Sequence, residues 1–359
     1  MSVRTHIKRL FGRGNGPDAP SSLSQISWAP NEDHDAEGDL STAATESQRE
    51  LDVGEASRFS WRPKPSATST SLSEATTLAE ASSSPSGTRC ITDGVSNNPR
   101  QRTIGIETLY SPPEGLLATV DIVFIHGITG SSRGTWTYRR KGVEVFWSAE
   151  LLRLDIPDAR ILTFGYDANV VNWTSAASAN RLANHAENLL GGLSRFRERS
   201  ESSHRPVIFV MHSLGGLVVQ NALDLSRSSP EPHLRLLEAC TTGLAFLGTP
   251  HFGSDLASWG AFWTSVVNLV KTTNTNIVQV LHPDSEVLAI VQRKFHEVLR
   301  IRQSQGNAIK VACFYEELQM AHVGLVVPMS SAILLGYPSY GIHADHRVFR
   351  EPPYISTAS

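Results

Sequence analysis

The stretch VIFVMHSLGG, from Val207 to Gly216, joins an unbroken apolar run to a serine followed by small residues. A short apolar run rich in β-branched residues predicts a buried strand, and LGGLVVQNALDLS directly after it predicts a helix. A hydroxyl at such a junction either caps the helix or stands at a sharp turn as a nucleophile. The rest of the sequence has to decide between these two interpretations.

Similar apolar runs occur on both sides of this stretch. TVDIVFIHG, ARILTFGYD, TTGLAFLGTPH and IKVACFYEEL each predict a strand, and SAASANRLANHAENLLGGLSRFRE between two of them predicts an amphipathic helix. Strands that alternate with helices are typical of a mostly parallel sheet with helices on both faces. The predicted fold class is therefore α/β.

The chain divides by composition. Residues 1–115 hold Ser/Thr-rich tracts and an acidic stretch with few aromatic or aliphatic residues, so we predict a disordered tail. Residues 116–350 carry the apolar runs and are predicted to form the folded domain. Residues 251–303 are longer than one crossover helix requires, which suggests a helical insertion that forms a lid.

Composition narrows the classes of function. The net charge of −3 over 359 residues provides no general basic field for nucleic acid. Cys90, Cys240 and Cys313 lack metal-ligand spacing, so we expect reduced thiols, no metal and a cytoplasmic protein. The basic start, MSVRTHIKRLFGRGNG, is either a solvated tail or a weak mitochondrial or membrane-surface address.

The serine at the junction is Ser213. The usual nucleophile turn has the pattern G-x-S-x-G, because the residues two positions before and after the serine face neighbouring backbone. Gly215 fits this pattern, whereas Met211 stands where a small residue is expected. The sequence of the turn therefore favours a nucleophile but does not exclude a helix cap.

A second motif, FIHGITGS, ends the first strong strand. The backbone amides of Ile128 and Leu214 are candidates for an oxyanion hole, which binds the charge that develops in acyl transfer. Gly127 gives this loop its freedom. We expect the side chain of His126 to brace the loop rather than to react.

An acid and a histidine should follow the nucleophile in that order. Glu316 and Glu317 end a predicted strand at the edge where an acid belongs, and Glu316 is favoured; Asp255 and Asp284 are the other candidates.

Two late histidines, His343 and His346, lie in GIHADHRVF, and His346 is the favoured base. His251 precedes the acid, so we expect it to shape the pocket.

Taken together, the motifs VDIVFIHGITGSSRGTW, ARILTFGYDANV, FVMHSLGGLVVQNAL, GLAFLGTPHFGSDLA, FYEEL and GIHADHR resemble a family of serine esterases. This is the lipase-like α/β-hydrolase module at the N-terminus of fungal NACHT, ankyrin and TPR receptor-like proteins. It is similar to mitochondrial serine-active-site phospholipid-remodelling proteins and to GPI inositol-deacylase lipases. The resemblance covers roughly residues 116–346.

The resemblance implies an α/β-hydrolase fold and a triad of Ser213, Glu316 and His346, which agrees with the order of the motifs. The residues expected to support the triad are His126, Gly127, His212, Gly215 and His251. The implied reaction is hydrolysis of an acyl ester through an acyl-enzyme and without a cofactor, and a phospholipid at a membrane surface is among the substrates that the resemblance includes. The alternative is a non-catalytic signalling module on the same fold.

The end of the sequence departs from the family. After A-D-H-R the family usually continues into a final helix, whereas here VFREPPYISTAS follows and Pro352 and Pro353 forbid a helix through that point. We therefore expect the element that supports the histidine loop to be missing or altered.

Overall fold

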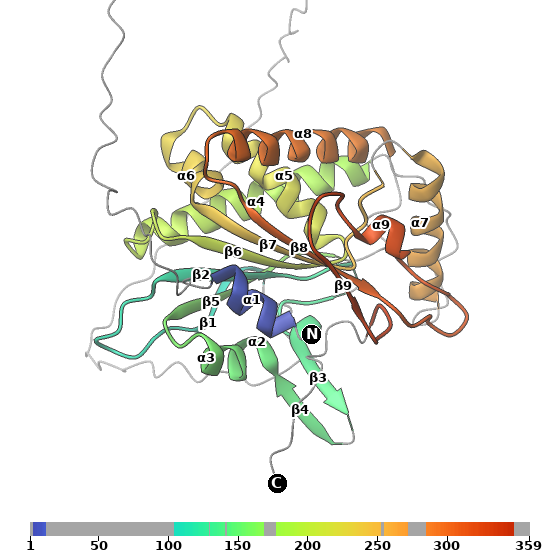
Figure 1. The fold of residues 1–359 in the computed structure, drawn as a ribbon, viewed down its shortest axis with the longest axis horizontal. Helices are drawn as coiled ribbons and strands as arrows, with labels where there is room; N and C mark the ends of the chain where they lie inside the picture. The colour runs from blue at the N-terminus through green and yellow to red at the C-terminus, as the bar shows by residue number, and fades with distance from the viewer. Residues whose placement is uncertain are drawn as a thin grey trace, which may run out of the picture. The chain divides into compact units, whose positions relative to one another are not determined.

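The structure is a computed structural model that describes residues 3–11, 104–128, 130–140, 142–168, 177–252, 255–271 and 285–347. A seven-stranded sheet lies at its centre (Figure 1). Most of the tail predicted to be disordered, Asp284 and the last twelve residues lie outside the described residues.

The sheet has the strand order β1-β5-β2-β6-β7-β8-β9. The strands are β1 (Gly105–Tyr110), β2 (Val120–Ile125), β5 (Ala159–Gly165), β6 (Val207–His212), β7 (Thr241–Leu247), β8 (Lys310–Glu316) and β9 (Ser339–Ile342). β1 runs antiparallel to β5 at one edge, and all other neighbours are parallel. The predicted parallel sheet is thus confirmed.

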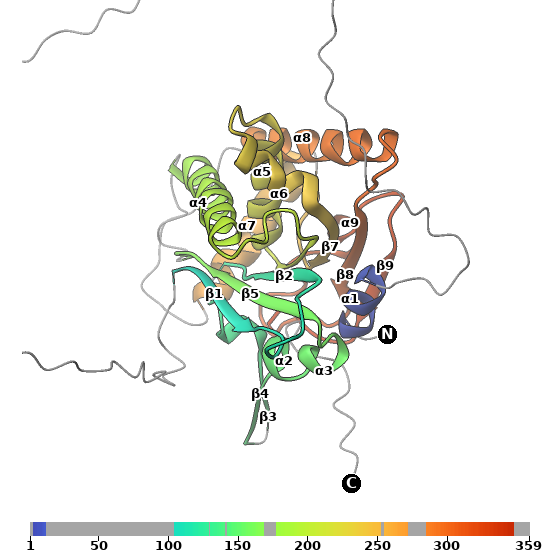
Figure 2. The ribbon, with the colours of Figure 1, turned by 90° about the vertical axis from the view of Figure 1, so that its left-hand side faces the viewer.

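Helices cover both faces of this sheet (Figure 2). One face packs against α4 (Ala177–Arg199), α5 (Gly215–Ser228), α6 (Pro232–Cys240) and α8 (Ser285–Ser304). The other face packs against α1 (Val3–Phe11), α2 (Trp147–Glu150) and α3 (Leu152–Asp155). The remaining elements are the short helices η1 (Gly134–Trp136) and α9 (Met329–Ala332), the helix α7 (Leu256–Lys271), and a hairpin of β3 (Thr137–Arg140) and β4 (Val143–Phe146).

Two apolar clusters follow from these two covered faces. In β6, Phe209 and Met211 belong to the cluster under α4, α5 and α8, whereas Ile208 and Val210 belong to the opposite cluster. Successive side chains of a strand point to opposite faces, so a strand covered on both sides is apolar throughout. All six residues of β2 and of β6 are buried accordingly.

Two segments inside the predicted tail are ordered, which corrects the boundary at residue 115. β1 pairs along β5, and α1 packs on the sheet with Val3 and Ile7 fully buried. The composition argument missed them because each is short, and each is stabilised by residues far along the chain.

The predicted lid also needs a correction. Within 251–303, α8 packs against α5 and buries Phe295, Val298 and Leu299 in the main core, so it serves as the crossover helix between β7 and β8. α7 buries Trp259 and Trp263. Residues 253–254 and 272–284 lie outside the described residues.

Candidate active site

Ser213 lies in the tight turn between β6 and α5, at the carboxyl end of a central strand. Its φ of 50° is left-handed, and its amide donates to the carbonyl of Leu247 at 2.8 Å. A left-handed non-glycine residue costs about 1–3 kcal/mol and persists only where the surroundings impose it. The hydroxyl of Ser213 is buried and has no hydrogen-bond partner in the described part of the chain. It does not cap the helix.

Glycines make this turn possible. A Cβ on Gly215 would lie 2.5 Å from the carbonyl oxygen of His126, and a Cβ on Gly127 would lie 2.7 Å from the Cβ of Ser213. Real Cβ atoms essentially never come within 3.0 Å of another heavy atom, and a Cβ on Gly127 would also lie 2.8 Å from the carbonyl oxygen of His212, so both positions require glycine. The loop after β2 and the loop after β6 therefore touch at the serine.

The expectation that position 211 must be small is wrong for this protein. Met211 is fully buried in the main cluster, between Ile125 of β2 and Phe246 of β7 in the sheet register. An unbranched, flexible side chain can fill such a core site. The departure at Met211 is thus accommodated by packing, and the turn keeps its left-handed serine.

Glu316 and His346 meet in the interior. Nδ1 of His346 lies 3.3 Å from Oε2 of Glu316, within ion-pair range, although these two atoms are not aligned for a hydrogen bond. Both side chains are almost fully buried, with 4% and 0% of their surface exposed. The other carboxylate oxygen of Glu316 accepts a 2.7 Å hydrogen bond from the amide of Val327.

The turn at Ser213 and the loop of His346 are held together by His212. Nε2 of His212 lies 3.2 Å from the carbonyl oxygen of His346, and the two imidazole rings are 4.9 Å apart. Gly248, after β7, lies against the ring of His346, because a Cβ there would be 3.2 Å from its Cε1 and Nδ1. The structure thus brings the predicted acid and base beside the strand ends that frame Ser213.

The other candidate acids have different environments. Oε2 of Glu317 lies 3.5 Å from Nδ1 of His343, but this pair is largely exposed. Asp255 accepts hydrogen bonds from the amides of Ala257 and Ser258, as an N-cap of α7 does. The buried carboxylate–imidazole pair is therefore Glu316 with His346, which the residues alone had left open.

His126 braces the loop after β2. The amide of Tyr166 donates to its Nε2 at 3.2 Å, so Nδ1 carries the proton of a neutral ring and donates to the carbonyl of Gly127 at 3.0 Å. Its ring also stacks on Tyr166 at 4.4 Å. Because both ring nitrogens make hydrogen bonds, the side chain of His126 is placed to stabilise this loop.

The two amides suggested for an oxyanion hole lie directly after Gly127 and Ser213, the residues at which the two loops touch. Leu214 precedes the first residue of α5, and Ile128 follows Gly127. The first amides of a helix lack partners within the helix and favour negative charge. Both residues are buried.

His251 contacts groups other than the Glu316–His346 pair. Its backbone amide donates to the carbonyl of Ser331 at 2.6 Å. Its ring atom Nδ1 lies 3.2 Å from Nε2, the side-chain amide nitrogen, of Gln220. Burial, with a smaller contribution from His296, lowers the pKa of His251 to about 3. A ring that stays neutral across physiological pH and packs on Phe246 supports the region below the turn.

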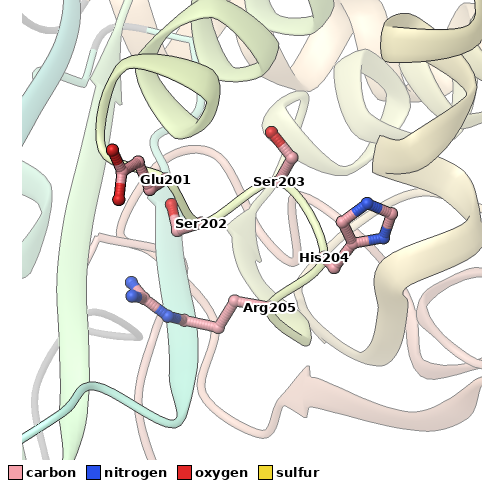
Figure 3. A pocket seen from close by; sticks show the side chains of 5 residues that line it. All are labelled: Glu201, Ser202, Ser203, His204 and Arg205. Atoms are coloured by element: carbon pink, nitrogen blue, oxygen red, sulfur yellow. The ribbon is translucent and has the colours of Figure 1, made fainter.

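An open cavity of about 390 Å³ lies at the opposite end of β6, lined by residues 201–205. Figure 3 shows that the side chains of Ser203, His204 and Arg205 point away from one another. Three arginines near this loop are instead bound to Asp121, which is fully buried: Arg160, Arg197 and Arg205. The cavity therefore has no convergent set of groups for chemistry.

Within the described residues, no cluster of three metal-ligating side chains occurs, and no helix has the length and apolar character to cross a membrane. Cys240 and Cys313 are free thiols, as predicted, and burial raises the pKa of both. Cys90 lies outside the described residues.

A mostly parallel sheet with a serine in a tight turn after a central strand, and a carboxylate and a histidine after later strands, is the arrangement of the α/β hydrolases. The model of the Alpha/beta hydrolase family matches residues 122–305, just over half of the 359 residues. The protein belongs to the alpha/beta hydrolase family.

Particular relatives are more distant. Protein SERAC1 of Bos taurus is 28% identical over a region that covers 60% of this chain and 33% of that protein. Protein SERAC1 of Danio rerio is 29% identical with the same coverage. The chain thus spans about a third of the length of the curated relatives it matches.

Among solved structures, the chain is similar to a lipase-esterase related protein from Clostridium acetobutylicum. The identity is 10%, the superposition covers 68% of this chain and 93% of that one, and the TM-score is 0.32. This distant likeness adds nothing to what the family match shows.

Proposed function

We propose that the protein is a serine hydrolase that cleaves carboxylic esters through an acyl-enzyme. The observation that carries the proposal is the buried pair of Glu316 and His346, whose loop is tied by His212 to the turn that presents Ser213. A buried carboxylate beside an imidazole and a strained serine is the set of groups that acyl transfer requires.

The reaction begins at Ser213. Its hydroxyl oxygen attacks the acyl carbonyl while its proton passes to Nε2 of His346. The attack converts the acyl carbon into a tetrahedral intermediate. The negative oxygen accepts hydrogen bonds from the amides of Ile128 and Leu214. Collapse of the intermediate breaks the ester bond, and the alcohol leaves with the proton from His346.

Water then reverses the same sequence. His346 takes a proton from water, the hydroxide attacks the acyl-serine, and the acid product leaves as Ser213 regains its proton. Contacts that are loosely aligned in the free enzyme tighten in such complexes. This accounts for a Glu316–His346 distance of 3.3 Å without hydrogen-bond alignment.

Glu316 stabilises the charged base in this scheme. Its carboxylate is fully buried, so the imidazolium that forms on His346 is the opposite charge that compensates it. The hydrogen bond from Val327 fixes the orientation of the carboxylate. The acid therefore orients His346 and does not itself take the proton.

The proposed substrate class rests on the resemblance of the motifs and not on the geometry of the site. The motifs resemble lipase-like and phospholipid-remodelling proteins, so we propose a lipid ester, hydrolysed at a membrane surface, as the natural substrate. The geometry itself supports acyl transfer. One argument for a non-catalytic module was that Met211 departs from the usual nucleophile turn. Because Met211 packs in the core, this argument no longer applies.

The first test is turnover of p-nitrophenyl esters with short and long acyl chains by the full-length protein. We expect release of p-nitrophenol, with a preference for longer chains if the substrate is a lipid. A preference for the acetate ester would exclude lipid esters as the natural substrate but would still support the proposed esterase activity. A folded protein with no turnover of any ester would contradict the proposed function.

Glu316→Gln should lower kcat for ester hydrolysis by about 10⁴-fold, because a neutral amide neither orients nor stabilises the imidazolium of His346. Glu317→Gln is the matched control. Its side chain is 42% exposed and pairs with the exposed His343, so we expect activity within about twofold of wild type. Steady-state kinetics of both variants decide this, and equal losses in the two would remove Glu316 from the proposed triad.

A further inference from the structure

α1 lies on the sheet face opposite α4, α5 and α8, over the part of the sheet that contains β7 and β8 (Figure 1). It belongs to the same compact unit as the sheet. Val3, His6 and Ile7 are buried, whereas Thr5, Lys8 and Arg9 are exposed. The predicted solvated tail is thus wrong for these residues, since the helix uses its apolar face to dock.

The docked face touches the strands that carry the proposed acid and base. The ring of His6 lies 3.8 Å from that of Tyr340 in β9 and 5.4 Å from that of Phe314 in β8. Phe314 and Tyr340 are register partners, and Glu316 pairs with Ile342 two residues further along each strand. β8 ends at Glu316, and the chain from β9 reaches His346 four residues after Ile342.

The apolar contacts continue toward the histidine loop. Val3 and Ile7 share one core cluster with Phe314, Ile342 and Ala344. Ala344 lies two residues before His346, and its carbonyl accepts the amide of Leu318. The cluster that α1 completes therefore extends from the acid strand into the loop of the base.

A polar contact fixes α1 at its other side. Nε of Arg4 donates to Oδ2 of Asp155 in α3 at 2.7 Å, and both side chains are mostly buried. α1 thereby bridges α3 to the β8–β9 edge of the sheet, with contacts to β7, β8 and α3. β9 has four residues and, among the described strands, pairs with β8 alone, and a short edge strand has little stability of its own.

We propose that α1 is a positioning element of the active site, and that His6 and Ile7 hold β8 and β9 in the register that places Glu316 against His346. The inference rests on the proposed function. It gives the strand and loop that carry Glu316 and His346 a support from the start of the chain, through the cluster that Val3 and Ile7 share with Phe314, Ile342 and Ala344. The apolar face that could enter a membrane surface is the face that packs on the sheet, so α1 cannot do both at once.

The test compares two full-length variants that add the same charge to α1. Ile7→Glu places a carboxylate in the buried face and undocks the helix, whereas Thr5→Glu places it on the exposed face. We expect Ile7→Glu to lower kcat for p-nitrophenyl ester hydrolysis at least about tenfold with KM within about twofold, because small misplacements of catalytic groups act on the chemical step. Thr5→Glu should match wild type.

Two further measurements separate positioning from general stability. Ile7→Val keeps the apolar contact, so its kcat should equal that of wild type. All rates are taken at a temperature where circular dichroism shows each variant folded. If Ile7→Glu does not fold, Ile7→Ala replaces it, with an expected threefold or larger loss of kcat. Unchanged kcat in the folded Ile7 variants of an active protein overturns the positioning role alone, whereas a wild type without turnover overturns the proposed function and this inference with it.

Discussion

Ser213→Ala is expected to lower kcat for ester hydrolysis by about 10⁶-fold, to near the background rate, because the covalent route disappears with the hydroxyl. The variant should also be as stable as wild type. The hydroxyl of Ser213 has no hydrogen-bond partner in the described residues, so its removal breaks no hydrogen bond there, and the change in unfolding free energy should stay within about 0.5 kcal/mol.

The measurement pairs ester kinetics with thermal unfolding of both proteins. Ser339→Ala is a suitable control, because this serine is exposed on the edge strand β9 and should leave both quantities unchanged. Activity that survives in Ser213→Ala would assign the nucleophile elsewhere. A large loss of stability would instead indicate that the serine is a packing residue.

His346→Ala is expected to produce a loss of similar size, about 10⁴- to 10⁶-fold in kcat, because the imidazole proposed to take the proton of Ser213 is lost. The backbone carbonyl that His212 contacts is retained in this variant, so the loop keeps that tie. The readout is kcat at saturating ester, together with circular dichroism to show that the protein is folded.

His343→Ala separates the two late histidines. Its side chain is 81% exposed and pairs with Glu317 at the surface, so activity should stay within about twofold of wild type. A larger loss in His343→Ala than in His346→Ala would reverse the assignment of the base. Equal activity of wild type and His346→Ala would remove the imidazole from the mechanism.

The sequence predicted the parts of the fold whose signals are local. β2, β5 and β6 are buried on both faces, so their unbroken apolar runs are legible without a structure. The same holds for α4, whose apolar residues recur at helical spacing. These elements were placed within a few residues of their ends.

The parts that escaped prediction depend on distant partners. β9 has four residues with one fully buried side chain, and β1 is half-buried, so neither shows a strong strand pattern. α1 is stabilised by Phe314 and Tyr340, more than 300 positions away. Composition cannot report a contact of that kind.

The candidate site shows the same division. Ser213 could be proposed from its strand–turn–helix context, and Gly215 from the tightness of the turn. The residues favoured Glu316 without excluding Glu317, since adjacent side chains of a strand alternate between interior and surface and the sequence does not show which of the two points inward. The contact of His212 with the carbonyl of His346 had no sequence signal, because it joins residues from separate loops.

The central claim is that Ser213 is an activated nucleophile, and a fluorophosphonate probe tests it most directly. The full-length protein is treated with the probe, and the modified residue is located by mass spectrometry of its peptides. The account predicts one adduct, on Ser213, which is absent in Ser213→Ala and forms much more slowly in His346→Ala. An adduct on another serine, or none on a folded wild type, would contradict it.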